Sequence, residues 1–241
     1  IELIREKMDN KNMSFEEALE KTKDEIVFTT HTPVAAGNEK HNIDLLKQMG
    51  LLEYIPEKKL IEMGGQPFDM TAACLRISSI ANGVSELHQK TAREMWNNLN
   101  NSAPIISITN GVHVKTWQDP SIKKTFENKG DLWKTHMQMK QKLVKYIKEN
   151  EDAKMNPDNL IIGFARRAAP YKRGELIFRD TPQIEEYLKK GKLQLVFSGK
   201  AHPEDHYGKD IVATLVKMDQ KFKDSVVFLE NYDMKIASYL T

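Results

Sequence analysis

A cluster of basic residues follows an apolar segment near the middle of the chain. The segment NLIIGFA, residues 159–165, leads directly into Arg166, Arg167, Lys172 and Arg173. Arginine presents a planar fork of donors and lysine a compact charge, so the cluster suits a tetrahedral dianion such as phosphate. A helix predicted over residues 174–179 would add its N-terminal dipole. The alternative is a solvated basic turn, but the position after a strand predicted to be buried favours the phosphate site.

Two further polar residues follow predicted strands. His31 lies in THTP and Asn110 in TNGV. A histidine at a strand end either donates to a ligand hydroxyl or satisfies a backbone carbonyl. Asn110 and the glycine after it form a turn signal, and the amide could instead face a sugar with both its donor and its acceptor.

The segment HPEDH places His202 and His206 four residues apart, which is a spacing that can chelate a metal on a helix. It matches neither HExxH nor HxxEH, so we expect no metal site. Gly199 and Lys200, just before it, form a second and weaker candidate for an anion site.

Composition indicates a globular protein without a broad nucleic-acid surface. The 241 residues are 40% hydrophobic and carry a formal net charge of +2. The single cysteine, Cys74, excludes an intrachain disulfide and fits a reducing compartment. The sequence contains neither a secretory signal nor an apolar run of about 20 residues. We therefore expect a cytoplasmic enzyme that binds neither nucleic acid nor membranes.

Apolar strands alternate with helices along the chain, which predicts an α/β fold with parallel sheets covered on both faces. Ligands in such folds bind beyond the carboxyl ends of the strands. The predicted strands are residues 25–30, 104–107, 159–165, 193–199 and 225–229. The predicted helices include residues 14–24, which begin with a capping box, and residues 42–49, 69–81, 85–96, 131–150 and 183–190, with another ending near residue 221.

The motifs VFTTHTPVAAGNEK, ANGVSELHQK, ITNGVHVKTW, GFARRAAPYKRGELIFRD, VFSGKAHPEDHYGK and VFLENYDM together resemble the α-glucan phosphorylases of the short bacterial and archaeal type. The resemblance implies a fold of the GT-B type, built from two Rossmann-like domains. Residues 1–117 would form the end of the N-terminal domain and residues 118–241 the first part of the C-terminal, cofactor-side domain. The chain therefore looks like an internal fragment.

The resemblance also implies an activity, which is phosphorolysis of α-1,4-glucan or maltodextrin ends by inorganic phosphate to α-D-glucose 1-phosphate, with retention. Pyridoxal 5′-phosphate is the implied cofactor. By motif, Arg167 and Lys172 resemble the pair that holds the substrate phosphate, and Lys172 also lies near the cofactor phosphate. The implied sugar contacts are Tyr171, His31 and Asn110. The other residues implied around the cofactor phosphate are Arg166, Trp117 and Tyr232.

One part of the family pattern is missing from the sequence. The Gly-rich segment with the Schiff-base lysine is absent, and the family would place it beyond Thr241, so we expect residues 1–241 alone to be inactive. Two alternatives stay open: a nucleotide-sugar glucosyltransferase of the glycogen or starch synthase kind, and a catalytically dead glucan-binding segment. Homo-oligomerisation of the intact protein also stays open.

Overall fold

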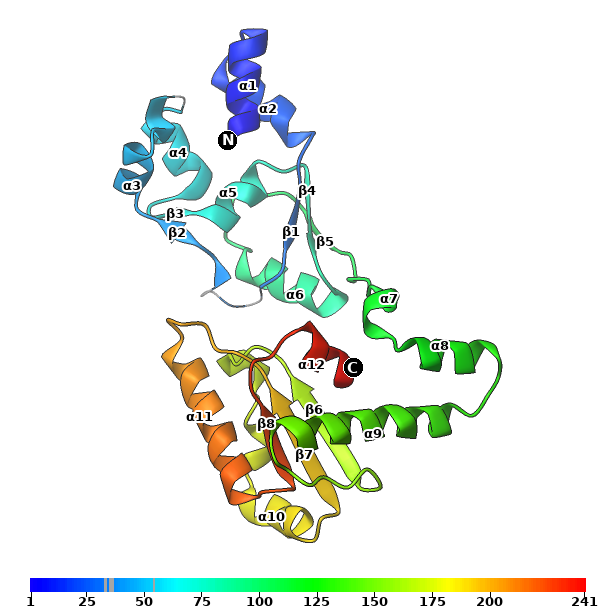
Figure 1. The fold of residues 1–241 in the computed structure, drawn as a ribbon. Helices are drawn as coiled ribbons and strands as arrows, with labels where there is room; N and C mark the ends of the chain where they lie inside the picture. The colour runs from blue at the N-terminus through cyan, green and yellow to red at the C-terminus, as the bar shows by residue number, and fades with distance from the viewer. Residues whose placement is uncertain (33, 35–36, 54) are drawn as a thin grey trace. The chain divides into compact units, whose positions relative to one another are not determined.

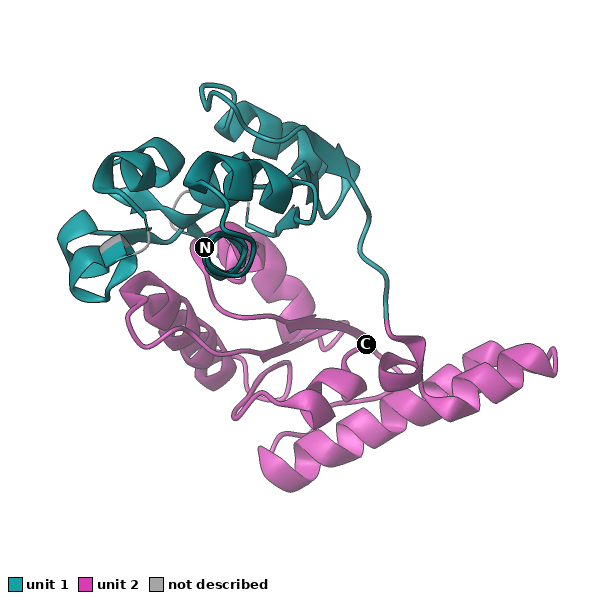
Figure 2. Cartoon of the chain, turned by 90° about the horizontal axis from the view of Figure 1, so that it is seen from above, with its two compact units in different colours: residues 1–112 teal, residues 113–241 magenta. Residues whose placement is uncertain are grey.

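The chain forms two compact units, residues 1–112 and residues 113–241, in a computed structural model that describes residues 1–32, 34, 37–53 and 55–241 (Figure 2). Each unit contains a three-stranded parallel sheet flanked by helices, which confirms the mixed α/β class with parallel sheets. The units divide after Val112, whereas the sequence predicted a domain boundary after Trp117. The assignment of the units to the two phosphorylase domains stays a prediction.

The first unit is built on strands β1 (Val27–Thr30), β4 (Ile80–Gly83) and β5 (Ile105–Ser107), in the order β1-β4-β5 (Figure 1). A short antiparallel pair, β2 (Lys40–His41) and β3 (Phe68–Asp69), lies apart from this sheet. The helices are α1 (Glu2–Lys11), α2 (Phe15–Lys23), α3 (Ile43–Gln48), α4 (Glu57–Gly64), α5 (Met70–Arg76) and α6 (Glu86–Met95), with a 3₁₀ turn at Leu51–Glu53.

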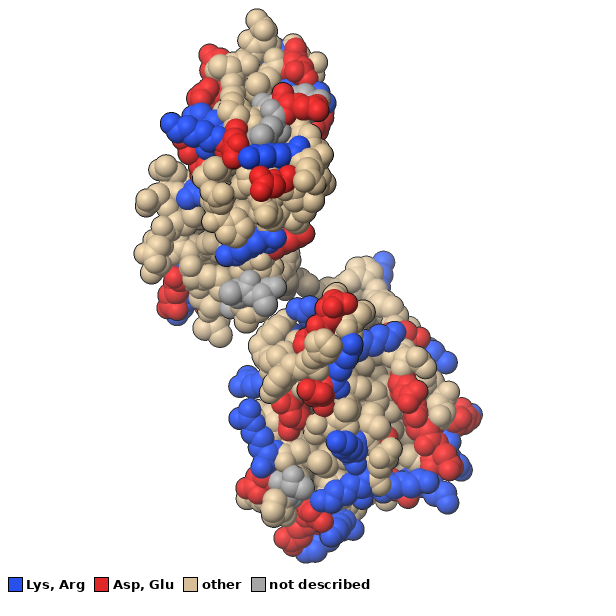
Figure 3. Space-filling view, turned by 90° about the vertical axis from the view of Figure 1, so that its left-hand side faces the viewer, with Lys and Arg blue, Asp and Glu red and all other residues tan. Residues whose placement is uncertain are grey.

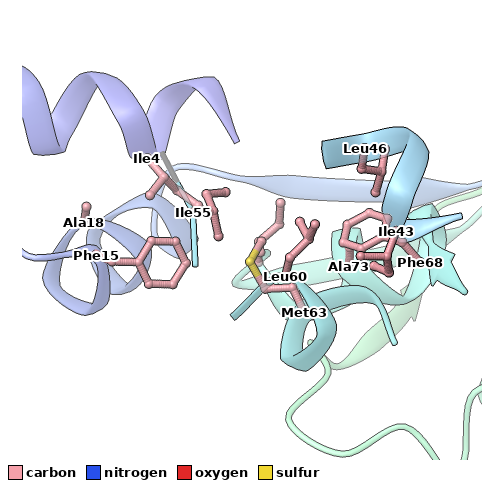
Figure 4. Close-up of a cluster of buried hydrophobic side chains, with 11 residues drawn as sticks. Ile4, Phe15, Ala18, Ile43, Leu46, Ile55, Leu60, Met63, Phe68 and Ala73 are labelled. Atoms are coloured by element: carbon pink, nitrogen blue, oxygen red, sulfur yellow. The ribbon is translucent and has the colours of Figure 1, made fainter. Parts of the chain in front are cut away.

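An apolar cluster joins the helices of the first unit (Figure 4). Ile4 from α1 and Phe15 from α2 belong to the same cluster as Leu60 and Met63 from α4. Helix α2 begins with the expected capping box, because the Ser14 hydroxyl accepts from the Glu17 amide and the Glu17 carboxylate accepts from the Ser14 amide. A second cluster packs α6 against β4 and β5.

The second unit is built on strands β6 (Leu160–Ala165), β7 (Leu193–Ser198) and β8 (Val226–Leu229), in the order β6-β7-β8. Its helices are α7 (Val114–Trp117), α8 (Pro120–Glu127), α9 (Leu132–Asn150), α10 (Thr181–Lys189), α11 (His206–Lys221) and α12 (Met234–Tyr239). Alternate side chains of a strand point to opposite faces of the sheet. Accordingly Leu195 and Phe197 pack in the cluster that includes α11, and Val196 packs in the cluster that includes α9 and α12.

Two details of the second unit correct the sequence-based prediction. The strand before the basic cluster is not buried, because β6 lies at the edge of the described sheet and Leu160 is 61% exposed. The helix predicted over residues 174–179 is wrong as well, since only a 3₁₀ turn forms there, at Leu176–Phe178, after an earlier 3₁₀ turn at Pro170–Lys172. Arg173 lies between the two turns with a left-handed φ of 55°, which prevents a continuous helix.

Charged side chains of both signs are interspersed on the face of each unit that Figure 3 shows. This pattern agrees with the near balance of 36 basic and 34 acidic residues in the sequence. Within the described residues, no helix is both long enough and apolar enough to cross a bilayer.

Candidate anion site

Two loops run side by side beyond the carboxyl ends of β6 and β7. The Arg166 amide donates to the Ser198 carbonyl at 3.1 Å, and the Ala168 amide donates to the Lys200 carbonyl at 2.9 Å. These bonds continue the pairing of the two strands, whose last paired residues are Ala165 and Ser198. The start of the basic cluster is therefore held by backbone bonds to the centre of the sheet.

The close approach of these loops explains two glycines. A Cβ atom on Gly199 would lie 2.0 Å from the Arg166 carbonyl oxygen, so only glycine fits there. A Cβ atom on Gly208 would lie 2.6 Å from the Ala168 carbonyl oxygen, which shows how closely the first turn of α11 packs against the same loop. Gly199 was part of the weaker predicted anion site, and its packing gives it a structural explanation.

Two residues of the basic cluster, Arg167 and Lys172, form a compact group with Tyr171. An Arg167 guanidinium N–H donates to the Tyr171 hydroxyl at 2.7 Å, and the guanidinium carbon lies 5.8 Å from the centre of the tyrosine ring. The Lys172 ammonium lies 4.8 Å from the same ring centre, which is within the range of a cation–π contact. The hydrogen bond from Arg167, and then the charge of Lys172, lower the pKa of Tyr171.

A cavity of about 600 Å³ opens beside this group. Its lining residues include Ile162, Phe164 and Leu195 from the sheet and Arg166, Lys172 and Arg173 from the loop. A second, smaller cavity shares Arg166 and Lys172 with the first and is also lined by Arg167. The arrangement combines apolar walls with cationic side chains, so it can take an anionic group attached to an apolar one.

Helix dipoles contribute less to this site than the sequence predicted. Because residues 174–179 hold only a 3₁₀ turn, the positive field at the cluster comes from the side chains of Arg166, Arg167, Lys172 and Arg173. The nearby α11 begins with a cap, in which the Asp205 carboxylate accepts from the Gly208 amide at 2.8 Å. That carboxylate offsets the dipole of α11 at its first turn.

Trp117 and Tyr232, the other two residues predicted to surround the cofactor phosphate, are not among the described residues that line the two cavities. Trp117 is half-buried at the end of the short helix α7. Tyr232 follows β8, is half-buried, and packs against the apolar cluster that includes residues of α9 and α12.

In the first unit, His31 and Asn110 both lie beyond the carboxyl ends of strands of one parallel sheet. His31 directly follows β1 and is exposed, and Asn110 follows β5 and is exposed as well. The strand β4 lies between β1 and β5, and the Asn110 amide donates to the Val84 carbonyl just beyond β4 at 3.2 Å. Within the His31 motif, Pro33, Ala35 and Ala36 lie outside the described residues.

Other histidines have local roles in packing and loop structure. His88, the third residue of α6, is buried and its Nδ1 accepts from the Val84 amide at 3.2 Å. His202 precedes α11, which begins only at His206, so these two histidines do not share a helical face. The described residues contain no group of three or more His, Cys, Asp or Glu side chains placed to hold a metal ion.

Comparison with known proteins finds relatives named maltodextrin phosphorylase and glycogen phosphorylase. The chain is 33% identical to the maltodextrin phosphorylase of Thermococcus litoralis, over 93% of this chain and 33% of that protein. It is 31% identical to the glycogen phosphorylase of Mycobacterium bovis, over 100% of this chain and 35% of that protein. The chain is related to the α-glucan phosphorylases.

These matches cover only part of the length of each relative. The chain spans about a third to two fifths of the length of the relatives named phosphorylase. It also matches an uncharacterized protein of Methanocaldococcus jannaschii, with 34% identity over 93% of this chain and 44% of that protein. No protein-family model matches the chain.

Sequence reasoning missed the contacts that organise the basic cluster. The motif GFARRAAPYKR identified Arg167, Tyr171 and Lys172 as separate ligand contacts, but it gave no sign that Tyr171 bonds to Arg167. The four-residue spacing of these two side chains, across a proline that starts a tight turn, is a signal that could have suggested the bond.

Proposed function

We propose that a protein containing this chain phosphorolyses the non-reducing ends of α-1,4-glucans, such as maltodextrin, to α-D-glucose 1-phosphate with retention at the anomeric carbon. The observation that carries the proposal is the cluster of Arg167, Tyr171 and Lys172 beyond the carboxyl end of β6. Its support is the relationship to proteins named maltodextrin phosphorylase and glycogen phosphorylase.

The proposed roles follow from the chemistry of each side chain. Arg167 and Lys172 bind inorganic phosphate, because a guanidinium fork and an ammonium group match a tetrahedral dianion. Tyr171 contacts the terminal glucose through its hydroxyl. His31 and Asn110, which follow β1 and β5 of the first unit, are proposed to hydrogen-bond sugar hydroxyl groups.

Pyridoxal 5′-phosphate is the proposed cofactor, and it is supported by a cavity of the second unit that has apolar walls and three cations, Arg166, Lys172 and Arg173. Arg166 and Lys172 would hold the cofactor phosphate, and Trp117 and Tyr232 are proposed to complete its surroundings. When bound, this cofactor supplies a phosphate group able to exchange a proton with the substrate phosphate. The lysine that would bind the cofactor covalently is not assigned to any residue of this chain.

Clustered cations are the main requirement of such a site, because two phosphate groups would otherwise repel each other. At about 4 Å and an effective dielectric constant near 20, each pair of unit charges interacts by about 4 kcal/mol. Arg166, Arg167 and Lys172 offset this repulsion and can stabilise the negative charge of the phosphate that attacks the anomeric carbon, while the glucan oxygen leaves with a proton. The half-buried Lys172 lines the larger cavity together with Arg166, which suits cations proposed to face a phosphate group there.

The test is a product assay with the full-length protein. Maltodextrin and orthophosphate are expected to yield glucose 1-phosphate, and ADP-glucose or UDP-glucose is expected to give no glucan extension. The opposite pattern would identify a nucleotide-sugar transferase, and no turnover of either kind would identify a glucan-binding protein. Borohydride reduction that fixes a pyridoxal chromophore to the protein would support the cofactor independently of turnover.

A further inference from the structure

Tyr171 contacts both Arg167 and Lys172 of the basic cluster. Its hydroxyl accepts an N–H of Arg167 at 2.7 Å, and its ring lies 4.8 Å from the Lys172 ammonium. Both cations are therefore placed around one side chain, and no acidic residue forms an ion pair with either of them among the described residues.

The Arg167 bond to Tyr171 leaves the guanidinium able to bind an anion. A guanidinium carries five N–H donors in a rigid fork, and the tyrosine hydroxyl uses one of them. Because the fork is planar, fixing one nitrogen also fixes the direction of the other donors. A neutral hydroxyl holds the guanidinium in place without neutralising its charge, whereas a carboxylate would compete with the incoming anion.

We infer that Tyr171 is a positioning residue for oxyanion binding, which holds Arg167 and Lys172 in place before phosphate arrives. This inference rests on the proposed function, because it concerns the phosphate site of that reaction. A free arginine side chain loses considerable rotamer freedom when it is ordered, and an arginine that is already held loses less when the anion binds. The Tyr171 hydroxyl keeps its own proton, which remains available to the sugar.

The first experiment measures inorganic phosphate binding to the full-length protein by calorimetry, so that it does not depend on turnover. Tyr171→Phe removes the hydroxyl and keeps the ring, so the fold and the ring contact with Lys172 are expected to survive. We expect its Kd for phosphate to rise about three- to tenfold, the effect of one exposed hydrogen bond to a charged group. Tyr187→Phe is the control, because Tyr187 lies exposed on α10.

The second experiment tests the link through tyrosine ionisation, followed by ultraviolet absorbance. Arg167 and Lys172 lower the pKa of Tyr171, so a bound phosphate, which offsets their charge, should raise that pKa toward its usual value. The phosphate-dependent part of the titration should disappear in Tyr171→Phe and persist in Tyr187→Phe. A tyrosine remote from the bound phosphate would not show this dependence, so the titration reports whether phosphate binds beside Tyr171.

The outcomes separate the inference from the proposed function. Equal phosphate affinity in the parent protein and Tyr171→Phe would overturn the positioning role and leave the proposed phosphate site standing. No phosphate binding in the parent protein would overturn both. Weaker binding with a lost phosphate-dependent titration, at an unchanged thermal midpoint, would support the positioning role even if the glucan product differed from the one proposed.

Discussion

Gly199→Ala is expected to damage the basic cluster without touching any charged side chain. The added Cβ atom would lie 2.0 Å from the Arg166 carbonyl oxygen and 3.1 Å from its carbon. These are backbone atoms and cannot rotate away, so the two loops must separate. Separation strains or breaks the Arg166–Ser198 and Ala168–Lys200 backbone bonds, which measure 3.1 and 2.9 Å.

The expected cost combines overpacking with weakened hydrogen bonds. Overpacking costs about 1–3 kcal/mol and each hydrogen bond contributes about 1 kcal/mol, and these effects overlap, so we expect a loss of about 2–4 kcal/mol in the free energy of unfolding. Urea denaturation followed by circular dichroism would measure it. Gly174→Ala, in the neighbouring loop after β6, is the control, because its Cβ atom would come no closer than 3.4 Å to a neighbour.

Two results would contradict the prediction for Gly199→Ala. If Gly199→Ala and Gly174→Ala had the same stability, the close approach of the two loops could not exist as described. If Gly199→Ala were destabilised but bound phosphate normally, the loop backbone would not be what positions the cations. We expect instead that phosphate affinity falls in Gly199→Ala even under conditions where the protein remains folded.

Two further predictions concern stability. Burial raises the pKa of Glu151 and of Asp219 above their usual values, so the folded state holds their protons more tightly and stability falls as pH rises through the raised values. Glu151→Gln should therefore raise the urea midpoint at neutral pH and have no such effect below about pH 4; a constant effect at all pH values would contradict this. Ser14→Ala removes the cap of α2 and should cost about 1 kcal/mol in urea denaturation, and an unchanged midpoint would show that the capping box contributes nothing.

Local chemistry explains why some elements could be predicted from the sequence. The Ser14 capping box, the long amphipathic α9 and the apolar run of β7 carry strong signals within their own residues. Each signal corresponds to the observed element. The cap bonds join residues that are near neighbours in the sequence, and the apolar run of β7 matches a strand that is buried along its whole length. The same reasoning placed the basic cluster beyond the carboxyl end of β6.

Features that depend on distant residues could not be predicted in this way. The strand β6 reads as buried because it is apolar, but it lies at the edge of the described sheet, and strand order is not written in its own residues. The helix expected at residues 174–179 is replaced by one 3₁₀ turn at Leu176–Phe178, and the left-handed Arg173 separates that turn from the turn at Pro170–Lys172. The bond between Tyr171 and Arg167 depends on that turn, and therefore was not foreseen.

The orthophosphate dependence of glucose 1-phosphate release from maltodextrin decides whether the basic cluster is the phosphate site of a phosphorylase. In the full-length protein, Arg167→Ala should raise the phosphate concentration needed for half-maximal rate and lower turnover together, by at least about tenfold, because it removes a charged partner of the anion. Arg179→Ala removes an equal charge from an exposed position after the loop and should leave both values unchanged. An unchanged phosphate dependence in Arg167→Ala would contradict the proposed phosphate site.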